Sequence, residues 1–185
     1  MLYIKRQIMR PPQILALGGS LLRPEESENR QLWLGKLRQL AVHIEGNSRK
    51  LGIVIGGGLP AREGIELAKN VMSNPDCLDE VGIAATRLNA TIIQQILIEI
   101  GCNVAPVIPH DTNSASELLA SYNFVIMGGT KPGQTTDAVA VTLARDCSAA
   151  ECIIATNVSH VYDKDPNTFP DCLLYTSPSP RDGLL

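Results

Sequence analysis

The chain has 185 residues, which is enough for one domain with a hydrophobic core and too few for two domains of ordinary size. Its composition, 44% hydrophobic and 19% charged, is that of a soluble globular protein, and its net charge of −3 gives no bulk attraction to nucleic acid or to an anionic membrane. No uninterrupted apolar run approaches the ~20 residues that a membrane span needs, so we expect a cytoplasmic protein.

The first half of the chain alternates short apolar runs with amphipathic segments. Residues 14–17 are predicted to form a buried strand, and apolar residues within 33–44 then recur at the spacing of one helix face. Residues 51–55 are apolar throughout, as strands of parallel sheets are. Pro60 suits the first turn of the next helix, and a longer helix is predicted at about 81–100.

The second half continues the alternation. Strands are predicted at residues 104–108, 124–127 and 152–155, and helices at 114–122 and 136–147. This order predicts an α/β fold, a three-layer αβα sandwich with a mostly parallel central sheet. Such sheets bind ligands beyond the carboxyl ends of their strands.

Three glycine-rich loops each follow a predicted strand and precede a predicted helix, at residues 18–20, 56–62 and 128–137. The free backbone N–H groups at a helix start, at the positive end of its dipole, suit an anion. Arg62 and Lys131 add cations to the second and third loops. We expect the three loops to converge at one edge of the sheet, and the sequence therefore predicts a phosphate-handling enzyme.

Two other nucleotide-binding folds are less consistent with the sequence. The second loop fits the loose dinucleotide pattern GxGxxA, but that fold requires an acidic residue about 20 positions on, at the end of the next strand. The acids here, Asp76, Asp79 and Glu80, stand at the start of another helix. No GxxxxGK[ST] string occurs, which excludes a P-loop kinase.

Five sequence strings in this order resemble the amino acid kinase family, most closely its archaeal-type uridylate (UMP) kinases. The resemblance covers about residues 14–170. The third and fourth strings are the most specific. The strings are LGGSLL (17–22), IVIGGGLPAR (53–62), LDEVGIAATRLNA (78–90), VIMGGTKPGQTTDAVA (125–140) and ATNVSHVYDKDP (155–166).

The resemblance implies an ATP:UMP phosphotransferase that makes UDP with Mg²⁺, in pyrimidine biosynthesis. It implies a homo-oligomer, a hexamer in the family, whose contacts include the apolar residues 92–98 of the long helix. The implied ATP contacts are Gly19, Ser20, Gly58, Arg62, Thr156, Asn157, Tyr162 and Asp165. The implied UMP contacts are Gly57, Asp79, Thr130, Lys131, Pro132, Gly133, Gln134, Thr135 and Thr136.

The chain departs from the family pattern at two places. Ser159 and His160 replace an aspartate and a glycine in the ATP loop, and Ala16 stands where many members carry a lysine. Arg62, Lys131 and Mg²⁺ are then the main positive charges for catalysis, while the ligands of the metal stay unassigned. No acid–base residue is required, because a phosphate nucleophile is already ionised at neutral pH.

Two alternatives stay open from the sequence. One is another phosphotransferase of this fold, with a carboxylate or a different phosphomonoester as acceptor. The other is a non-catalytic anion- or nucleotide-binding storage protein on the same scaffold. The threonine loop at 135–137 and Arg62 favour the UMP kinase.

We expect the kinase domain to span residues 1–171 and to be incomplete at the C-terminus, with a non-native or disordered tail at 172–185. On that expectation the chain as written is poorly stable or inactive. The cysteines show no CxxC spacing and predict reduced core thiols rather than a zinc site or disulfides. They are Cys77, Cys102, Cys147, Cys152 and Cys172.

Overall fold

The computed structural model describes residues 10–22, 27–155, 161–162 and 174–175, and the chain divides into two compact units, residues 1–155 and 156–185. The first unit holds a four-stranded sheet in the order β3-β2-β1-β4, with every strand pair parallel. This sheet confirms the predicted parallel α/β architecture. Its strands are β1 (Gln13–Leu17), β2 (Leu51–Ile55), β3 (Phe124–Met127) and β4 (Glu151–Ala155).

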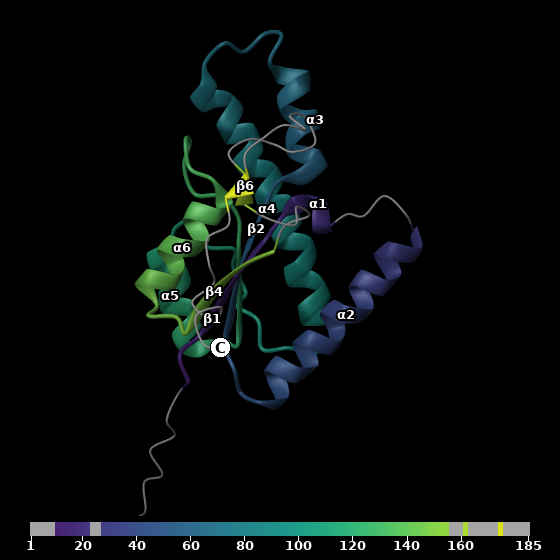
Figure 1. The fold of residues 1–185 in the computed structure, drawn as a ribbon, viewed down its shortest axis with the longest axis vertical. Helices are drawn as coiled ribbons and strands as arrows, with labels where there is room; N and C mark the ends of the chain where they lie inside the picture. The colour runs from purple at the N-terminus through teal and green to yellow at the C-terminus, as the bar shows by residue number, and fades with distance from the viewer. Residues whose placement is uncertain (1–9, 23–26, 156–160, 163–173, 176–185) are drawn as a thin grey trace, which may run out of the picture. The chain divides into compact units, whose positions relative to one another are not determined.

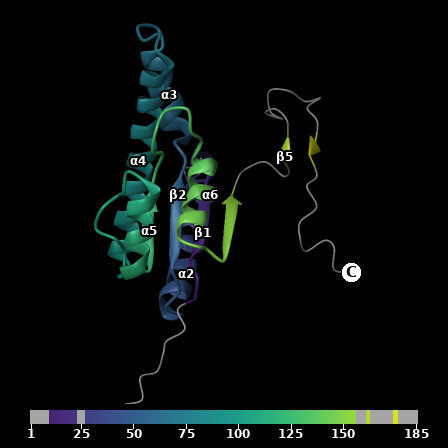
Figure 2. The same cartoon turned by 90° about the vertical axis from the view of Figure 1, so that its left-hand side faces the viewer.

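Helices cover both faces of the sheet, which confirms the three-layer prediction (Figure 1). α5 and α6 lie on one face and α2 and α4 on the other, while the α3–α4 hairpin extends beyond the strands (Figures 1 and 2). The helices described are α1 (Gly19–Leu22), α2 (Ser27–Gly46), α3 (Gly58–Ala68), α4 (Pro75–Glu99), α5 (Thr112–Ser121) and α6 (Thr136–Asp146).

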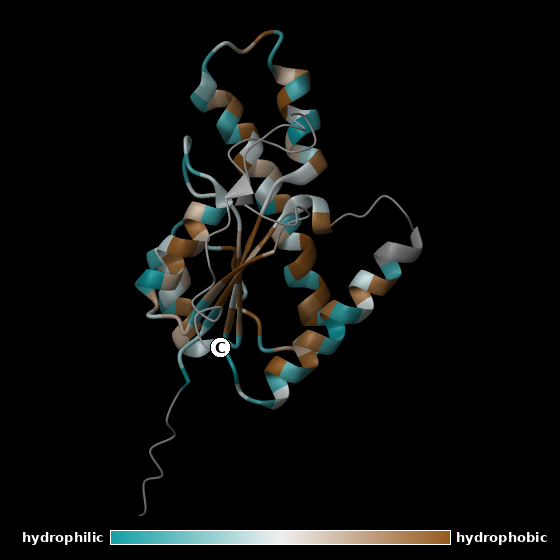
Figure 3. Ribbon diagram, viewed as in Figure 1, coloured by the Kyte–Doolittle hydropathy of each residue, from teal (hydrophilic) through white to brown (hydrophobic). Residues whose placement is uncertain are grey.

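Two clusters of buried apolar side chains pack against the two faces of the sheet. The strands are coloured mainly as hydrophobic (Figure 3). Side chains alternate between the faces of a strand, so Ile53 of β2 packs toward α2 and α4, whereas Val54 packs toward α5 and α6. Both are essentially inaccessible to solvent, like most of β1 to β3. This two-sided burial explains why the strands read as continuous apolar runs.

The long helix α4 begins six residues before the predicted start. Asn74 accepts a hydrogen bond from the Asp76 N–H and Pro75 follows it, which is a strong helix start signal. Of the helices described, α4 is long and apolar enough to cross a membrane by length and composition. Its buried Asn89 and Gln94 instead hydrogen-bond to neighbouring backbone carbonyls, as in a core helix.

The predicted strand at residues 104–108 is wrong. Only Val104 forms a bridge, to Phe124. Pro106 and Pro109 have no N–H to donate to a sheet. Side chains of α4 satisfy carbonyls instead: Gln94 donates to Ala105 O at 2.8 Å, and Arg87 donates to Ile108 O and Pro109 O at 2.7 and 3.0 Å.

The second unit contains β5 (Val161–Tyr162) and β6 (Leu174–Tyr175), which pair antiparallel. β6 falls within residues 172–185, which were expected to form a non-native or disordered tail. The cysteine prediction holds in part. Cys102, Cys147 and Cys152 are free and partly buried, and burial raises the pKa of each thiol, whereas Cys77 is exposed on α4.

Candidate active site

The three glycine-rich loops begin at the same edge of the sheet. Leu17, the last residue of β1, lies beside Ile55 of β2 and Ala155 of β4, and Val54 lies beside Met127 of β3. Because these strands are parallel, their following loops all leave at the carboxyl edge. The predicted convergence of the three loops is therefore confirmed.

The first and second loops touch backbone to backbone. A β-carbon at Gly19 would lie 2.3 Å from the amide nitrogen of Gly58, and one at Gly58 would lie 2.6 Å from the carbonyl oxygen of Gly19. Gly58 also has φ +59°, a conformation that glycine adopts without strain. Glycine at both positions is thus required for the loops to meet.

Helix α3 starts at this edge without a side-chain cap. Its N-cap is Gly57, and its first turn holds no acidic residue. By contrast, Asp111 caps α5 and Thr135 caps α6. The uncapped N–H groups of α3, at the positive end of its dipole, are available to a phosphate.

Arg62 lies one turn after Gly58 on α3 and is exposed. Residues four apart share one helix face, and side chains lean toward the N-terminus of a helix. The Arg62 guanidinium can therefore reach back to an anion held at the start of α3. Among the described residues it forms no salt bridge, so its charge is not neutralised there.

The third loop is tied to α4 at two points, near its start and in its middle. The Gly129 N–H donates to Thr86 Oγ1 at 2.7 Å, and the Gly133 N–H donates to Asp79 Oδ2 at 2.7 Å. Gly133 has φ +74°, which the turn at this point requires. Asp79, one of the implied UMP contacts, thus anchors the loop that carries the implied contacts at residues 130–136.

A hollow of about 340 Å³ opens beside this loop. The predicted residues Thr130, Lys131 and Gln134 line it, and the Thr130 hydroxyl donates to Gln134 Oε1 at 2.7 Å. Lys131 is exposed. The other lining residues come from the start of α5 and from α6: His110, Asp111, Thr112 and Thr142.

Arg87 of α4 binds the segment at residues 108–110. Its guanidinium donates to two carbonyls there and lies 3.1 Å from His110 Nε2. Burial lowers the pKa of Arg87. Asp111 caps α5, accepting a hydrogen bond from the Ser114 N–H at 2.8 Å.

The remaining predicted ATP contacts are not placed. Thr156, Asn157 and Asp165 lie outside the described residues, as do the substitutions Ser159 and His160. Tyr162 belongs to β5 in the second unit. Ser20 is exposed in α1, directly after Gly19.

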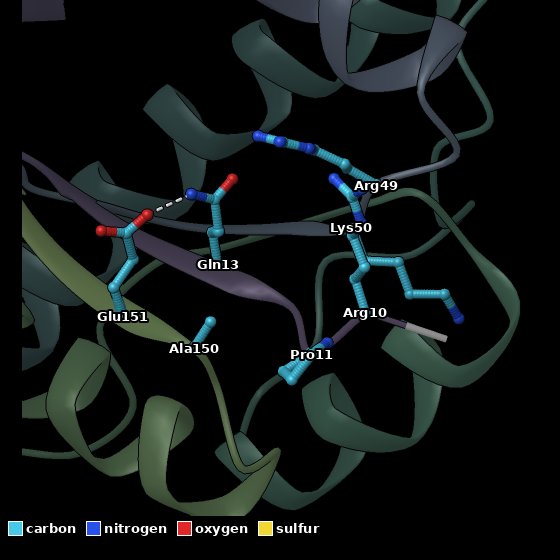
Figure 4. A pocket seen from close by; sticks show the side chains of 7 residues that line it. All are labelled: Arg10, Pro11, Gln13, Arg49, Lys50, Ala150 and Glu151. Atoms are coloured by element: carbon cyan, nitrogen blue, oxygen red, sulfur yellow. Dashed lines mark hydrogen bonds between the residues drawn. The ribbon is translucent and has the colours of Figure 1, made fainter. Parts of the chain in front are cut away.

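A second hollow, of about 310 Å³, lies at the opposite, amino edge of the sheet (Figure 4). It is basic, with Arg10, Arg49 and Lys50 in its wall, but Lys50 Nζ donates to the carbonyls of Leu119 and Ala120 at 2.5 Å each. These carbonyls belong to the last turn of α5, where a cation is stabilising. This hollow is not lined by a glycine loop and lies at the edge opposite to the three loops.

The sequence profile of the Amino acid kinase family matches residues 12–179. The chain belongs to the amino acid kinase family. Among curated members, it is 41% identical over 170 residues to the uridylate kinase of Archaeoglobus fulgidus, covering 91% of this chain and 72% of that protein. It is 36% identical over 173 residues to the uridylate kinase of Thermoplasma volcanium, covering 92% and 72%.

Solved structures agree with this membership. The crystal structure of the A. fulgidus uridylate kinase superposes with a TM-score of 0.68 at 40% identity, over 89% of this chain and 72% of that chain. The UMP kinase of Bacillus anthracis matches with a TM-score of 0.66 at 20% identity, over 90% and 73%, and supports the fold alone. The family membership and amino acid kinase fold expected from the five strings are confirmed.

Proposed function

We propose that this protein transfers the γ-phosphoryl group of ATP to UMP, giving UDP and ADP. The observation that carries the proposal is the contact of three glycine loops at one sheet edge, next to an uncapped helix start. Relatives of the same family at 36% and 41% identity are named uridylate kinases, which supports UMP as the acceptor.

The proposed chemistry consists of positioning and charge neutralisation. Gly19, Ser20 and Gly58 bind the donor phosphates, and Gly57 faces the acceptor phosphate. An oxygen of the UMP phosphate attacks the γ-phosphorus as the bond to the ADP oxygen breaks, and no side chain needs to remove a proton. Arg62 neutralises charge on the transferring oxygens, and Lys131 adds charge from the third loop.

Magnesium enters this proposal as part of the substrate MgATP. Among the described residues no three His, Cys, Asp or Glu side chains gather into a metal site. Mg²⁺ often binds through substrate phosphates with few protein ligands, which fits this arrangement. We also propose that the protein is a cytoplasmic homo-oligomer, with ATP and UMP as its small-molecule partners.

The test is UMP-dependent ADP release by the 185-residue chain, measured with MgATP and a panel of acceptors. UMP should be preferred over CMP, carbamate and amino acid carboxylates. Preference for a carboxylate would assign the chain to another phosphotransferase class of this fold. Tight nucleotide binding with no turnover for any acceptor, in a protein of the full length of its relatives, would favour the storage protein.

A further inference from the structure

Two polar side chains one turn apart on α4, Thr86 and Asn89, contact the second and third glycine loops. We propose that this pair, called here the α4 clamp, comprises positioning residues that fix the two loops relative to each other. Donor and acceptor phosphates would then be held at a set separation. The inference rests on the proposed function, because that function assigns a nucleotide to each loop.

Asn89 sets the direction of the second loop. It is fully buried, and its Nδ2 donates to the carbonyl oxygens of Gly56 and Gly57, both at 2.9 Å. In a trans peptide the C=O and the next N–H point in opposite directions. Holding these two carbonyls toward α4 therefore directs the N–H groups of Gly57 and Gly58 away from α4, as phosphate binding requires.

Thr86 connects the second loop to the third. Its hydroxyl donates to Ile83 O at 2.6 Å and accepts the Gly129 N–H at 2.7 Å, which uses its one proton and aims a lone pair at the loop. A β-carbon at Gly128 would lie 2.3 Å from Thr86 Oγ1, and one at Gly57 would lie 3.6 Å from its methyl carbon. Thr86 is thus packed between both loops.

The arrangement is costly in one respect. Asn89 Oδ1 is buried without a hydrogen-bond partner among the described residues, which destabilises the folded state. An apolar residue would avoid this cost but would leave the two glycine carbonyls unpaired. We therefore attribute the presence of Asn89 to the two hydrogen bonds that its Nδ2 donates, and not to its Oδ1.

Gln94 offers a matched control on the same helix. It is also buried, and its Nε2 donates to the backbone carbonyl of Ala105 at 2.8 Å, in a segment that carries none of the glycine loops. Thr86→Val and Asn89→Leu remove the clamp with little change of volume. Thr86→Ser restores the hydroxyl, and Gln94→Met removes a comparable hydrogen bond elsewhere.

The first experiment needs no activity. Amide-resolved hydrogen exchange by NMR on the full chain should show the Gly129 N–H exchanging about tenfold faster or more in Thr86→Val, because that amide loses its acceptor. Thr86→Ser should retain the slow exchange, and Gln94→Met should leave Gly129 unchanged. Unaltered exchange at Gly129 in Thr86→Val would overturn the clamp, whatever the protein binds.

The second experiment measures the dissociation constants of UMP and of a non-hydrolysable ATP analogue for the four variants. Thr86→Val should weaken UMP about tenfold and change the ATP analogue by less than about twofold, while Asn89→Leu should weaken both. Gln94→Met should lower stability without altering either constant. If Gln94→Met weakened nucleotide binding as much as Thr86→Val and Asn89→Leu do, the α4 clamp would contribute to stability alone and not to positioning. Wild-type protein that binds neither nucleotide would refute the proposed function, and the exchange result would still decide the clamp.

Discussion

The two edges of the sheet in residues 10–155 differ in how the backbone groups at their helix ends are satisfied. At the carboxyl edge, glycine replaces side chains, loops meet backbone to backbone, and the start of α3 is uncapped. At the amino edge, the Lys50 side chain satisfies the last carbonyls of α5. The start of α3 is thus left without a side-chain cap, which the proposed phosphate binding requires, whereas the end of α5 is capped by a side chain that contributes stability.

The largest expected effect comes from filling the contact between the first two loops. In Gly19→Ala the added carbon would lie 2.3 Å from Gly58 N and 2.6 Å from Gly56 O, and both are backbone atoms that cannot turn aside. We expect a loss of about 3 kcal/mol or more in the free energy of unfolding, measured by urea denaturation, with loss of kinase activity.

Gly35→Ala is the matched control for this change. Nothing lies within 4 Å of a β-carbon at Gly35, which stands inside α2. The substitution should stabilise the protein by up to about 1 kcal/mol through helix propensity. Wild-type stability and activity in Gly19→Ala would show that the loops do not meet as described.

The second-largest expected effect tests a charge, rather than packing, at the carboxyl edge. Arg62→Ala should lower kcat by about 10³-fold, which corresponds to about 4 kcal/mol of transition-state stabilisation, because a transferring phosphoryl group loses its guanidinium. Stability should hardly change, since Arg62 is exposed on α3. Steady-state kinetics with MgATP and UMP measure the effect, and exposed Arg38 on α2 provides a control as Arg38→Ala. An unchanged rate would remove Arg62 from the chemistry.

At the amino edge, in contrast, we expect a substitution to lower stability without lowering activity. Lys50→Met keeps the length of the side chain but leaves the Leu119 and Ala120 carbonyls without their donor. We expect a loss of about 1 to 2 kcal/mol in the free energy of unfolding, with kcat per folded molecule unaltered. Lys36→Met, at an exposed position of α2, should be neutral. If Lys50→Met instead raised the KM for a nucleotide, that result would indicate that the basic hollow takes part in nucleotide binding.

Much of this fold could be predicted from apolar runs. β2 and β3 match the predicted residues, and β1 and β4 each begin one residue earlier. Because these strands are buried on both faces, nearly all of their residues are apolar, and the apolar runs mark them in the sequence. The segment at 104–108 is also apolar, but it contains Pro106 and is followed by Pro109. Carbonyls of residues 105, 108 and 109 accept hydrogen bonds from side chains of α4, which sequence spacing does not bring near them.

The candidate site, too, could be predicted only in part. The glycine loops could be found because each follows a strand whose direction the fold class dictates. Thr86 and Asn89 could not be given their role, because helix periodicity identifies a buried face without revealing which backbone atoms that face meets. The available signal was three polar residues, Thr86, Asn89 and Gln94, on a helix face that is otherwise apolar, and it does not separate the first two from the third.

The smallest expected effect concerns two carboxylates near the start of α5: Asp111, which caps that helix, and Asp146, the last residue of α6. Hydrogen bonds from the Ser114 N–H and hydroxyl lower the pKa of Asp111, and one from the Thr112 hydroxyl lowers the pKa of Asp146. Each carboxylate therefore contributes stability that is present above its unfolded pKa, about 3.9, and is lost as pH falls through the lower folded-state value.

Urea denaturation between pH 6 and 2.5 should accordingly show a decrease in unfolding free energy on the acid side. The decrease should be smaller in Asp111→Asn, which keeps a capping oxygen without the titrating proton. Because Asp111 is exposed, solvent screening limits the difference to a fraction of the Lys50→Met effect. If Asp111→Asn also weakened UMP binding at pH 7, the cap of α5 would belong to the hollow beside Lys131, and both ends of that helix would no longer serve stability alone.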